Sequence, residues 1–248
     1  MSSGADHSGK GAEGMGALSG GRASSRGPAG AASYAGARRR PAWRLPTLSG
    51  PGPKRALDVL LSAALLILLA PVFLLLACVI KLVDGGPAIH WQRRVGYRGQ
   101  EFWFPKFRSM QVGAEKLQMA LRPYTDDPGN LTFKMRQDPR MTWIGRWIRA
   151  LSLDELPQLW SVLRGEMSLV GPRPPLPEEV AHYSETDRRR LEAKPGLTCI
   201  WQVSGRSEIP FPSQVKMDLY YIRHRDFWLD LKLLIRTIPA VLSCRGAY

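Results

Sequence analysis

The sequence is poor in the residues that build disulfide frameworks and metal clusters. Its 248 residues include only three cysteines, Cys78, Cys199 and Cys244, and four histidines that lie far apart. No C-x-x-C pair is present, which argues against a structural zinc site. The P-loop motif G-x-x-x-x-G-K-[ST], a nucleophile-elbow serine and H-E-x-x-H are also missing. P-loop kinases, serine hydrolases of that type and zinc proteases are therefore not expected.

Acidic residues are scarce relative to basic ones. The chain has 35 Lys and Arg against 21 Asp and Glu, which gives a formal net charge of +14 and a pI near 10.2. This excess favours an anionic partner, which by composition alone is a nucleic acid, an anionic membrane surface or a phosphorylated substrate. Apolar residues make up 44% of the chain, so global disorder is excluded.

Residues 1–53 differ from the rest of the chain. They contain half of the 24 glycines, many serines and alanines, and a run of arginines at 38–40. Such a segment buries too little apolar surface to offset the entropy lost on ordering. We predict a disordered basic tail over residues 1–53.

Residues 54–82 contain the longest apolar run. From Val59 to Ile80 there are 22 residues without a charge, about 33 Å as a straight helix and long enough to cross a bilayer. Pro71 at its centre favours a kink, and basic residues flank both ends, which the positive-inside rule assigns to the cytoplasm. We predict a re-entrant helix–break–helix; a single spanning helix is the alternative, and a lipoprotein-type signal peptide is a weaker one.

Residues 83–248 predict a helix-dominated α+β domain. Alternating segments with Trp and Phe indicate strands on either side of a turn at 96–99, and longer amphipathic segments indicate helices. The predicted strands are 88–93, 101–107 and 197–203, and the predicted helices are 113–121, 141–150, 153–163, 178–194, 213–224 and 229–242.

Two adjacent carboxylates, Asp154 and Glu155, follow Ser152. The spacing Ser-x-x-Glu before an apolar run is typical of a capping box, in which Ser152 caps a helix and Glu155 reaches back to it. Alternatively, two carboxylates about 100° apart around a helix take separate roles. One is suited to attack phosphorus as a nucleophile and the other to hold a divalent cation.

Several basic residues lie in stiff segments. Lys106 and Arg108 stand among aromatic residues, Arg149 precedes Ser152, and Arg173 lies between two prolines. Arginine binds phosphate through two hydrogen bonds and lysine binds it as a point charge, so together they would hold a diphosphate. Singly, each is more often a solvated surface residue. Toward the C-terminus, residues 211–242 mix aromatic and basic side chains, which suits either a membrane interface or an ordinary helix with solvated charges.

These segments, in this order, resemble the bacterial sugar transferase family, the monotopic polyprenyl-phosphate phosphoglycosyltransferases. The segments that carry the resemblance are 54–58, 106–110, 138–140, 152–159, 167–174, 194–198, 202–206 and 246–248, with Gly-Ala-Tyr at the end typical of the exopolysaccharide-initiating branch. Two departures stand out. Many members have Ser-Pro at the hairpin break, where this chain has Ala70-Pro71, and Cys199 follows Thr198 where the family usually has glycine.

The resemblance implies transfer of a sugar 1-phosphate from a UDP-sugar to polyprenyl (undecaprenyl) phosphate, with release of UMP and a requirement for Mg²⁺. It implies that Asp154 is the nucleophile and forms a phospho-sugar intermediate, and that Glu155 acts beside it at the metal. It further implies a place at the cytoplasmic face of the bacterial plasma membrane, on its anionic leaflet, with downstream glycosyltransferases as possible partners and no nucleic acid. The residues implied to bind substrate phosphates are Lys106, Arg108, Arg149, Arg173, Gln202 and Arg206.

Two other functions fit parts of the sequence. A membrane-anchored basic adaptor or a nucleic-acid-binding module, without catalysis, accounts for the pI, but no known nucleic-acid motif is present and the 22-residue apolar run is left unexplained. A hydrolase of lipid-linked phosphate would use Asp154 as well but would release free sugar phosphate. UMP release from a UDP-sugar together with a lipid-linked product distinguishes the three.

Overall fold

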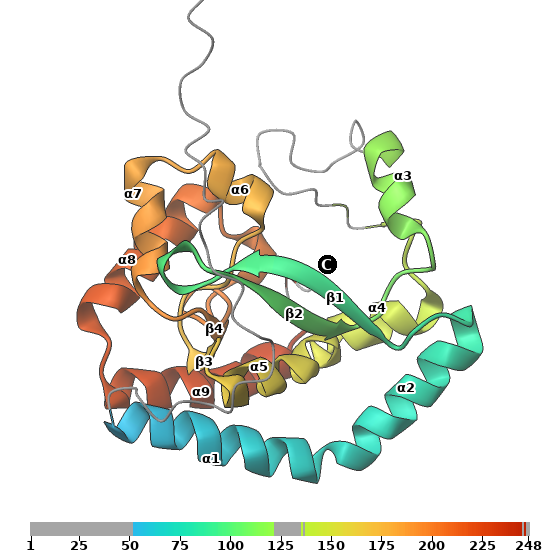
Figure 1. Cartoon of the computed structure of the whole chain (residues 1–248), viewed down its shortest axis with the longest axis horizontal. Helices are drawn as coiled ribbons and strands as arrows, with labels where there is room; N and C mark the ends of the chain where they lie inside the picture. Colours follow the sequence, from blue (N-terminus) through green and yellow to red (C-terminus); the bar gives the residue numbers. More distant parts are fainter. Residues whose placement is uncertain (1–51, 122–134, 136, 245, 247–248) are drawn as a thin grey trace, which may run out of the picture. The chain divides into compact units, whose positions relative to one another are not determined.

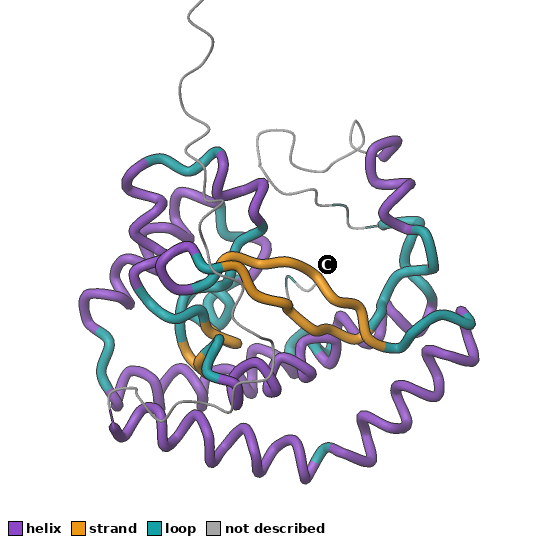
Figure 2. Tube along the Cα trace, viewed as in Figure 1, coloured by secondary structure: helices purple, strands orange, loops and turns teal. Residues whose placement is uncertain are grey.

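A computed structural model describes residues 52–121, 135, 137–244 and 246 (Figure 1). The predicted tail lies outside these residues, except that Gly52 and Pro53 already belong to the first helix. The described chain is helix-rich with two small sheets, as the sequence predicts (Figure 2).

The apolar run folds as two helices, α1 (Gly52–Leu68) and α2 (Ala70–Asp84), with a bend of 59° between them. The predicted break is confirmed, and Pro71 lies in the first turn of α2, where its missing N–H does no harm. With 17 and 15 residues, the helices are about 26 and 23 Å long. Among the described residues no single helix meets the length and hydropathy expected of a membrane span, whereas the bent pair does so jointly.

Helix α1 is attached to the rest of the fold through polar side chains. Lys54, Arg55 and Asp58, which we call the α1 latch, contact helix α5 (Leu159–Arg164), strand β3 (Ser168–Val170) and helix α9 (Phe227–Leu242). The C-terminal half of α2 is held by apolar packing instead, because Ile80 is 2% exposed and lies in a cluster with Phe107 and Ile148. Both ends of the helix pair therefore contact the same folded domain (Figure 1).

The first sheet is an antiparallel hairpin of β1 (Ile89–Val95) and β2 (Glu101–Phe107), joined through η1 (Tyr97–Gly99). Strand β2 has the predicted bounds, and β1 continues two residues past the predicted end. His90 pairs with Lys106 and Arg94 pairs with Phe102, so all four side chains share one face of the hairpin.

The second sheet is a short parallel pair, β3 with β4 (Gly196–Thr198). Immediately after β3, Gly171 lies against Gly196 so closely that a Cβ on Gly196 would stand 2.0 Å from the Gly171 nitrogen. Two backbone bonds, Gly171 N to Thr198 O and Gly196 N to Pro172 O, fix this crossing. The predicted strand 197–203 is wrong beyond Thr198, since turns follow there.

Two predicted helices are divided in the structure. Residues 153–163 form a 3-10 helix, η3 (Leu153–Gln158), followed by α5, with Pro157 at the end of the first segment. The predicted helix 178–194 is wrong, because Ser184 caps a new helix and accepts a bond from the Asp187 N–H. That stretch consists of α6 (Pro177–Ala181), α7 (Glu185–Arg188) and η4 (Arg189–Glu192).

The remaining α-helices are close to their predicted ranges. They are α3 (Ala114–Leu121), α4 (Trp143–Ala150), α8 (Phe211–His224) and α9. The short η5 (Arg206–Glu208) was not predicted. The larger core cluster centres on Phe104, Leu159, Met167 and Tyr221, all 2% exposed or less. It joins β2, α5, β3, α8 and α9.

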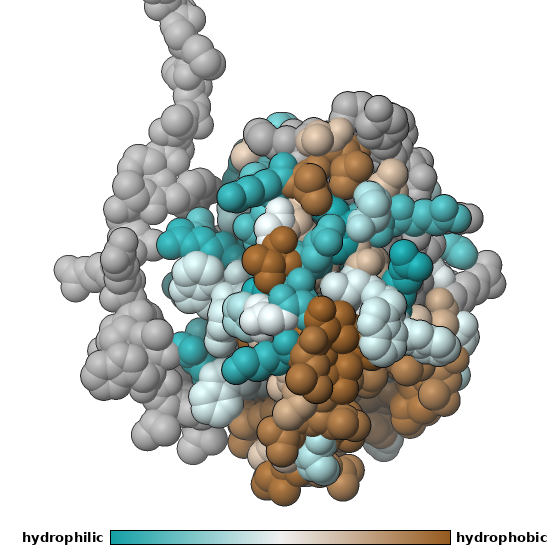
Figure 3. Space-filling model, turned by 90° about the vertical axis from the view of Figure 1, so that its right-hand side faces the viewer, coloured by the Kyte–Doolittle hydropathy of each residue, from teal (hydrophilic) through white to brown (hydrophobic). Residues whose placement is uncertain are grey.

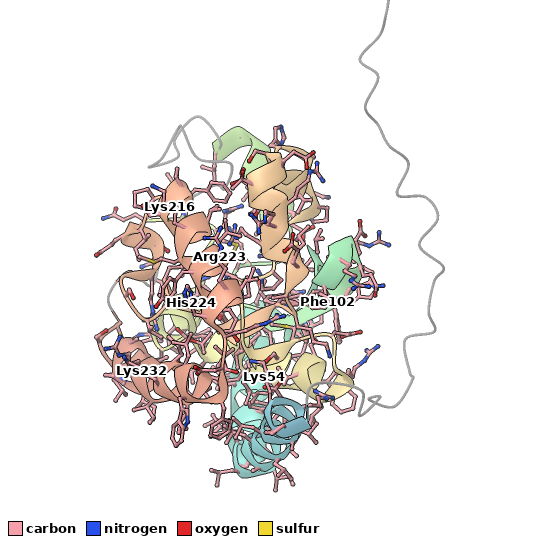
Figure 4. The ribbon with its side chains drawn as sticks, turned by 90° about the vertical axis from the view of Figure 1, so that its left-hand side faces the viewer. Lys54, Phe102, Lys216, Arg223, His224 and Lys232 are labelled. Carbon is pink, nitrogen blue, oxygen red and sulfur yellow. The ribbon has the colours of Figure 1, made fainter. Side chains whose placement is uncertain are left out.

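Large apolar side chains are exposed along the helix pair and α9. Figure 3 shows hydrophobic residues gathered on the lower part of one face, at the level of the helix pair. The side chains that are at least 60% exposed are Leu60, Ile67, Leu68, Leu74, Leu75 and Leu82 on the pair, and Trp228, Ile235, Ile238 and Leu242 on α9. Figure 4 shows basic residues on the two C-terminal helices, with Lys232 on α9 and Lys216, Arg223 and His224 along α8. A surface that combines apolar and basic side chains suits a lipid headgroup boundary.

Candidate active site

Asp154 and Glu155 lie in the first turn of η3, which packs against β2, α4 and α5. Ser152 just before them has a left-handed backbone with φ 53°, and its side chain caps nothing. The predicted capping box is therefore not formed. Glu155 points to another partner, because Arg173 Nη2 donates to its Oε1 at 2.6 Å.

Arg173 reaches Glu155 from the loop that follows β3. The Gly171–Gly196 crossing fixes the start of this loop, and the flanking prolines limit its backbone. The Arg173 side chain is 28% exposed and that of Glu155 is 19% exposed. The pair is therefore shielded by protein on most sides and still accessible to a ligand.

The two neighbouring carboxylates have different electrostatic surroundings. Burial, and then the charge of Glu155, raise the pKa of Asp154 to about 6, although Arg149, Lys106 and Arg173 limit the rise. Burial would raise the pKa of Glu155 too, but the charge and hydrogen bond of Arg173 outweigh it and lower that pKa. Glu155 is thus a firmly ionised ion-pair partner, and Asp154 is a more weakly stabilised carboxylate that is available to react.

Lys106 and Arg149 bring further positive charge to Asp154 from two elements. Lys106 lies near the end of β2, where burial and the charges of Arg94 and Arg149 lower its pKa to about 8. Arg149 lies in the last turn of α4, and its Nε donates to Ser109 Oγ at 3.0 Å. Arg149, Lys106 and Arg173, all predicted from the sequence, thus surround the carboxylates.

Arg94 is a fourth cation of this site, and the sequence reasoning missed it. Burial and the charge of Arg173 lower its pKa to about 10, and its own charge acts on Glu155 and Lys106. The predicted strand ended at Arg93, so Arg94 fell into the turn. Continuing the alternation of β1 by one residue would have placed Arg94 on the face of Lys106.

Three predicted substrate ligands are positioned differently. Arg108 lies beside Asp84 at the end of α2, with 3.6 Å between Nη1 and Oδ2. The Gln202 side-chain oxygen is buried without a hydrogen-bond partner in the described part of the chain. Arg206 begins η5 and has a left-handed backbone with φ 53°. It lies next to Gly246, so the segments 202–206 and 246–248 are in contact there. Their roles toward substrate remain predictions.

Asp154 and Glu155 suit Mg²⁺ only where substrate and water supply its other ligands. No group of three or more His, Cys, Asp or Glu side chains suited to a metal ion exists among the described residues. Two carboxylates are nevertheless enough where substrate phosphates and water complete the octahedron, which is the usual arrangement for Mg²⁺ at phosphoryl-transfer sites. The neighbouring cations fit the same picture, since they attract those phosphates.

Comparison with known proteins gives consistent results. Residues 51–244 match the family described as bacterial sugar transferase. The exopolysaccharide production protein ExoY of Rhizobium meliloti (strain 1021) is 41% identical over 198 residues, which cover 79% of this chain and 88% of that protein. The UDP-glucose:undecaprenyl-phosphate glucose-1-phosphate transferase of Caulobacter vibrioides is 39% identical over 217 residues, 84% of this chain and 77% of that protein.

A third relative is longer. The undecaprenyl-phosphate galactose phosphotransferase of Salmonella typhimurium is 41% identical over 198 residues, which are 79% of this chain and 41% of that protein. The family match includes the helix pair as well as the segments that carry Asp154 and Arg173. The resemblance inferred from the motifs is confirmed, and the chain belongs to the bacterial sugar transferase family.

Proposed function

We propose that this protein transfers a sugar 1-phosphate from a UDP-sugar to polyprenyl phosphate, releases UMP, and so initiates assembly of an exopolysaccharide or another glycan. The observation that carries the proposal is the pair Asp154–Glu155 with four cations around it, in a chain of this family. The names of its relatives support the same substrates.

The reaction follows from the chemistry of Asp154 as a nucleophile. An oxygen of Asp154 attacks the phosphorus that carries the sugar, and the bond from this phosphorus to the bridging oxygen breaks, so UMP leaves with that oxygen. Polyprenyl phosphate then attacks the same phosphorus with one of its oxygens. Its attack breaks the bond to Asp154, regenerates the carboxylate and yields a lipid diphosphate sugar.

The surrounding residues bind and orient the anions in this scheme. Arg173, Lys106 and Arg149 contact substrate phosphates and stabilise charge on the transferred group. Glu155 holds Arg173 in place through the 2.6 Å ion pair. When bound, Mg²⁺ would supply further charge neutralisation at the diphosphate, with Asp154 and Glu155 as its protein ligands.

We further propose that the helix pair is re-entrant and that the domain lies at the cytoplasmic face of the plasma membrane. A single crossing would put the start of α1 and the end of α2 on opposite sides of the bilayer. The latch and the Ile80 cluster instead attach both ends to one domain. The anionic leaflet matches the basic residues of α8 and α9 (Figure 4).

Thiol labelling tests this topology. In a cysteine-free background, single cysteines at Ser33 and at exposed Lys216 are treated with an impermeant reagent in intact cells and after lysis. Both positions should be protected until lysis. Labelling of position 33 alone in intact cells would mean a single crossing.

The activity is tested with purified protein, Mg²⁺, polyprenyl phosphate and a panel of UDP-sugars. The expected result is UMP release matched by a lipid-linked diphosphate sugar, the type of product that glycosyltransferases extend. Release of free sugar phosphate would indicate the hydrolase instead. No UMP from any UDP-sugar would leave the basic adaptor as the better description.

A further inference from the structure

Strand β1 is bonded at its end to the loop that carries Arg173. Arg94 Nη1 donates to the carbonyl oxygen of Pro174 at 3.0 Å, and the Val95 N–H donates to that of Pro175 at 2.9 Å. The crossing of Gly171 and Gly196 holds the other end of this loop. Arg173 therefore extends from a segment that is fixed on both sides.

The Arg94 side chain is itself held rigidly. Its Nε and Nη2 both donate to Gln92 Oε1, at 3.2 and 2.9 Å, so one planar guanidinium bridges Gln92 and Pro174. The guanidinium also stacks over the Phe104 ring, 5.2 Å from its centroid, and Phe104 is a core residue. A lysine at this position could not make these contacts together, because it has no fork of donors.

The charge of Arg94, like its hydrogen bonds, favours the observed position of Arg173. The ionisable groups around it include Arg173, Glu179, Glu155, Tyr183 and Lys106. Repulsion between the two guanidinium groups disfavours any orientation of Arg173 back over β1. In the structure Arg173 has Glu155 as its ion-pair partner.

We propose that Arg94 is a positioning residue of the transferase site, which holds the loop after β3 so that Arg173 meets Glu155. This inference rests on the function proposed above, and it assigns to Arg94 a role that acts through Arg173. Contact between Arg94 and the substrate is not required.

The first test compares Arg94→Met with Arg94→Lys and with Arg93→Met. Arg93 is a matched control, because it is the adjacent residue on the opposite face, 61% exposed, and paired with Glu101. We expect Arg94→Met to lower kcat/KM for the UDP-sugar roughly 10- to 100-fold, with Arg94→Lys within about threefold of it. Arg93→Met should stay within about twofold of the parent protein.

Thermal unfolding and turnover are measured on the same samples. A purely structural role would lower the unfolding midpoint and leave kcat/KM of the folded enzyme unchanged, which would overturn the proposal. Full activity in Arg94→Lys would also overturn it, since charge alone would then suffice. If Arg94→Met does not fold, Arg94→Lys still decides, because it retains the charge and loses only the bridge.

The second test asks whether Arg94 acts through Arg173. Turnover with enzyme in excess is measured for Arg94→Met, Arg173→Met and the double variant. The proposal expects the double variant to lose little more than Arg173→Met alone, whereas independent roles give multiplied losses. If the parent protein releases no UMP, the proposed function fails and the inference falls with it. If the parent is active and Arg94→Met equals Arg93→Met, the inference alone fails.

Discussion

At the start of α1 each charged side chain meets a partner inside the protein, whereas around η3 the cations outnumber the carboxylates. In the latch, Lys54 donates to Val170 O, Tyr221 Oη and Asp230, and Arg55 donates to two carbonyl oxygens at the end of α5, both at 2.7 Å. Asp58 accepts from the Leu169 N–H at 2.9 Å and from the Ser168 hydroxyl at 3.1 Å. Near η3, four cations face two carboxylates.

The difference indicates what each region is for. Charged side chains whose hydrogen bonds are made to groups of the protein hold two elements together and need no ligand. A surplus of partly accessible positive charge is costly without an anion to compensate it, so it indicates a site for one. The latch also changes the interpretation of Lys54 and Arg55. In the sequence they are two of the basic residues that flank the apolar run, but in the structure their side chains bind the protein.

The largest effect is expected at Asp154. Asp154→Asn removes the nucleophile, so turnover should fall by several orders of magnitude, and no sugar-phosphate adduct should form on the protein. Glu155→Gln should retain the nucleophile but loosen Arg173, and so lower activity less completely. Intact-protein mass spectrometry after incubation with UDP-sugar and Mg²⁺, without lipid acceptor, detects the adduct.

Unfolding midpoints of both variants serve as the control for that experiment. The midpoint of Asp154→Asn should stay close to that of the parent, because η3 has no side-chain cap to lose at Ser152. Glu155→Gln should lower the midpoint, because it breaks the ion pair with Arg173. An adduct on well-folded Asp154→Asn would show that another residue is the nucleophile.

A change of pH is expected to alter activity less than Asp154→Asn does. Asp154 attacks only as the anion, so kcat/KM should rise with pH through about 6, the pKa set by burial and Glu155. Lys106 is charged only below its pKa of about 8, so activity should fall again as pH rises through that value. Lys106→Arg should remove the alkaline decline, because arginine stays protonated throughout. A profile that stays flat between pH 5 and 9 would contradict both assignments.

Substitutions in the α1 latch should change the stability of the protein more than its activity. Asp58→Ala leaves the buried Leu169 N–H without its acceptor, which should lower the free energy of unfolding by about 1–3 kcal/mol. Ser62→Ala is a matched control on the same helix, since the Ser62 hydroxyl is buried and has no hydrogen-bond partner among the described residues. Its loss should be nearly neutral. Denaturant unfolding in detergent measures both, and equal losses would show that the latch bonds are unimportant.

Local sequence patterns predicted the helices and strands better than they predicted the contacts between them. The alternation of 101–107 gave β2 with its bounds, and Pro71 gave the break between α1 and α2. Arg94 was missed because one more residue of alternation in β1 looked like part of the turn. The capping box at Ser152 was wrong because its Glu155 bonds to Arg173, a partner that sequence spacing does not reveal.

The smallest expected change in unfolding free energy concerns two residues that precede helices, one of which caps its helix and one of which does not. Thr142 caps α4 by accepting a bond from the Gly145 N–H at 3.0 Å, so Thr142→Ala should lower the free energy of unfolding by about 1 kcal/mol. Ser152 precedes η3 in a left-handed conformation and caps nothing, so Ser152→Ala should stay within about 0.5 kcal/mol of the parent. Ser152→Gly should stabilise by up to about 1 kcal/mol, because glycine adopts a φ of 53° without strain. Chemical unfolding of the three variants gives the order. If Ser152→Ala costs as much as Thr142→Ala, the serine is a cap after all and the acids beside it need a structural explanation.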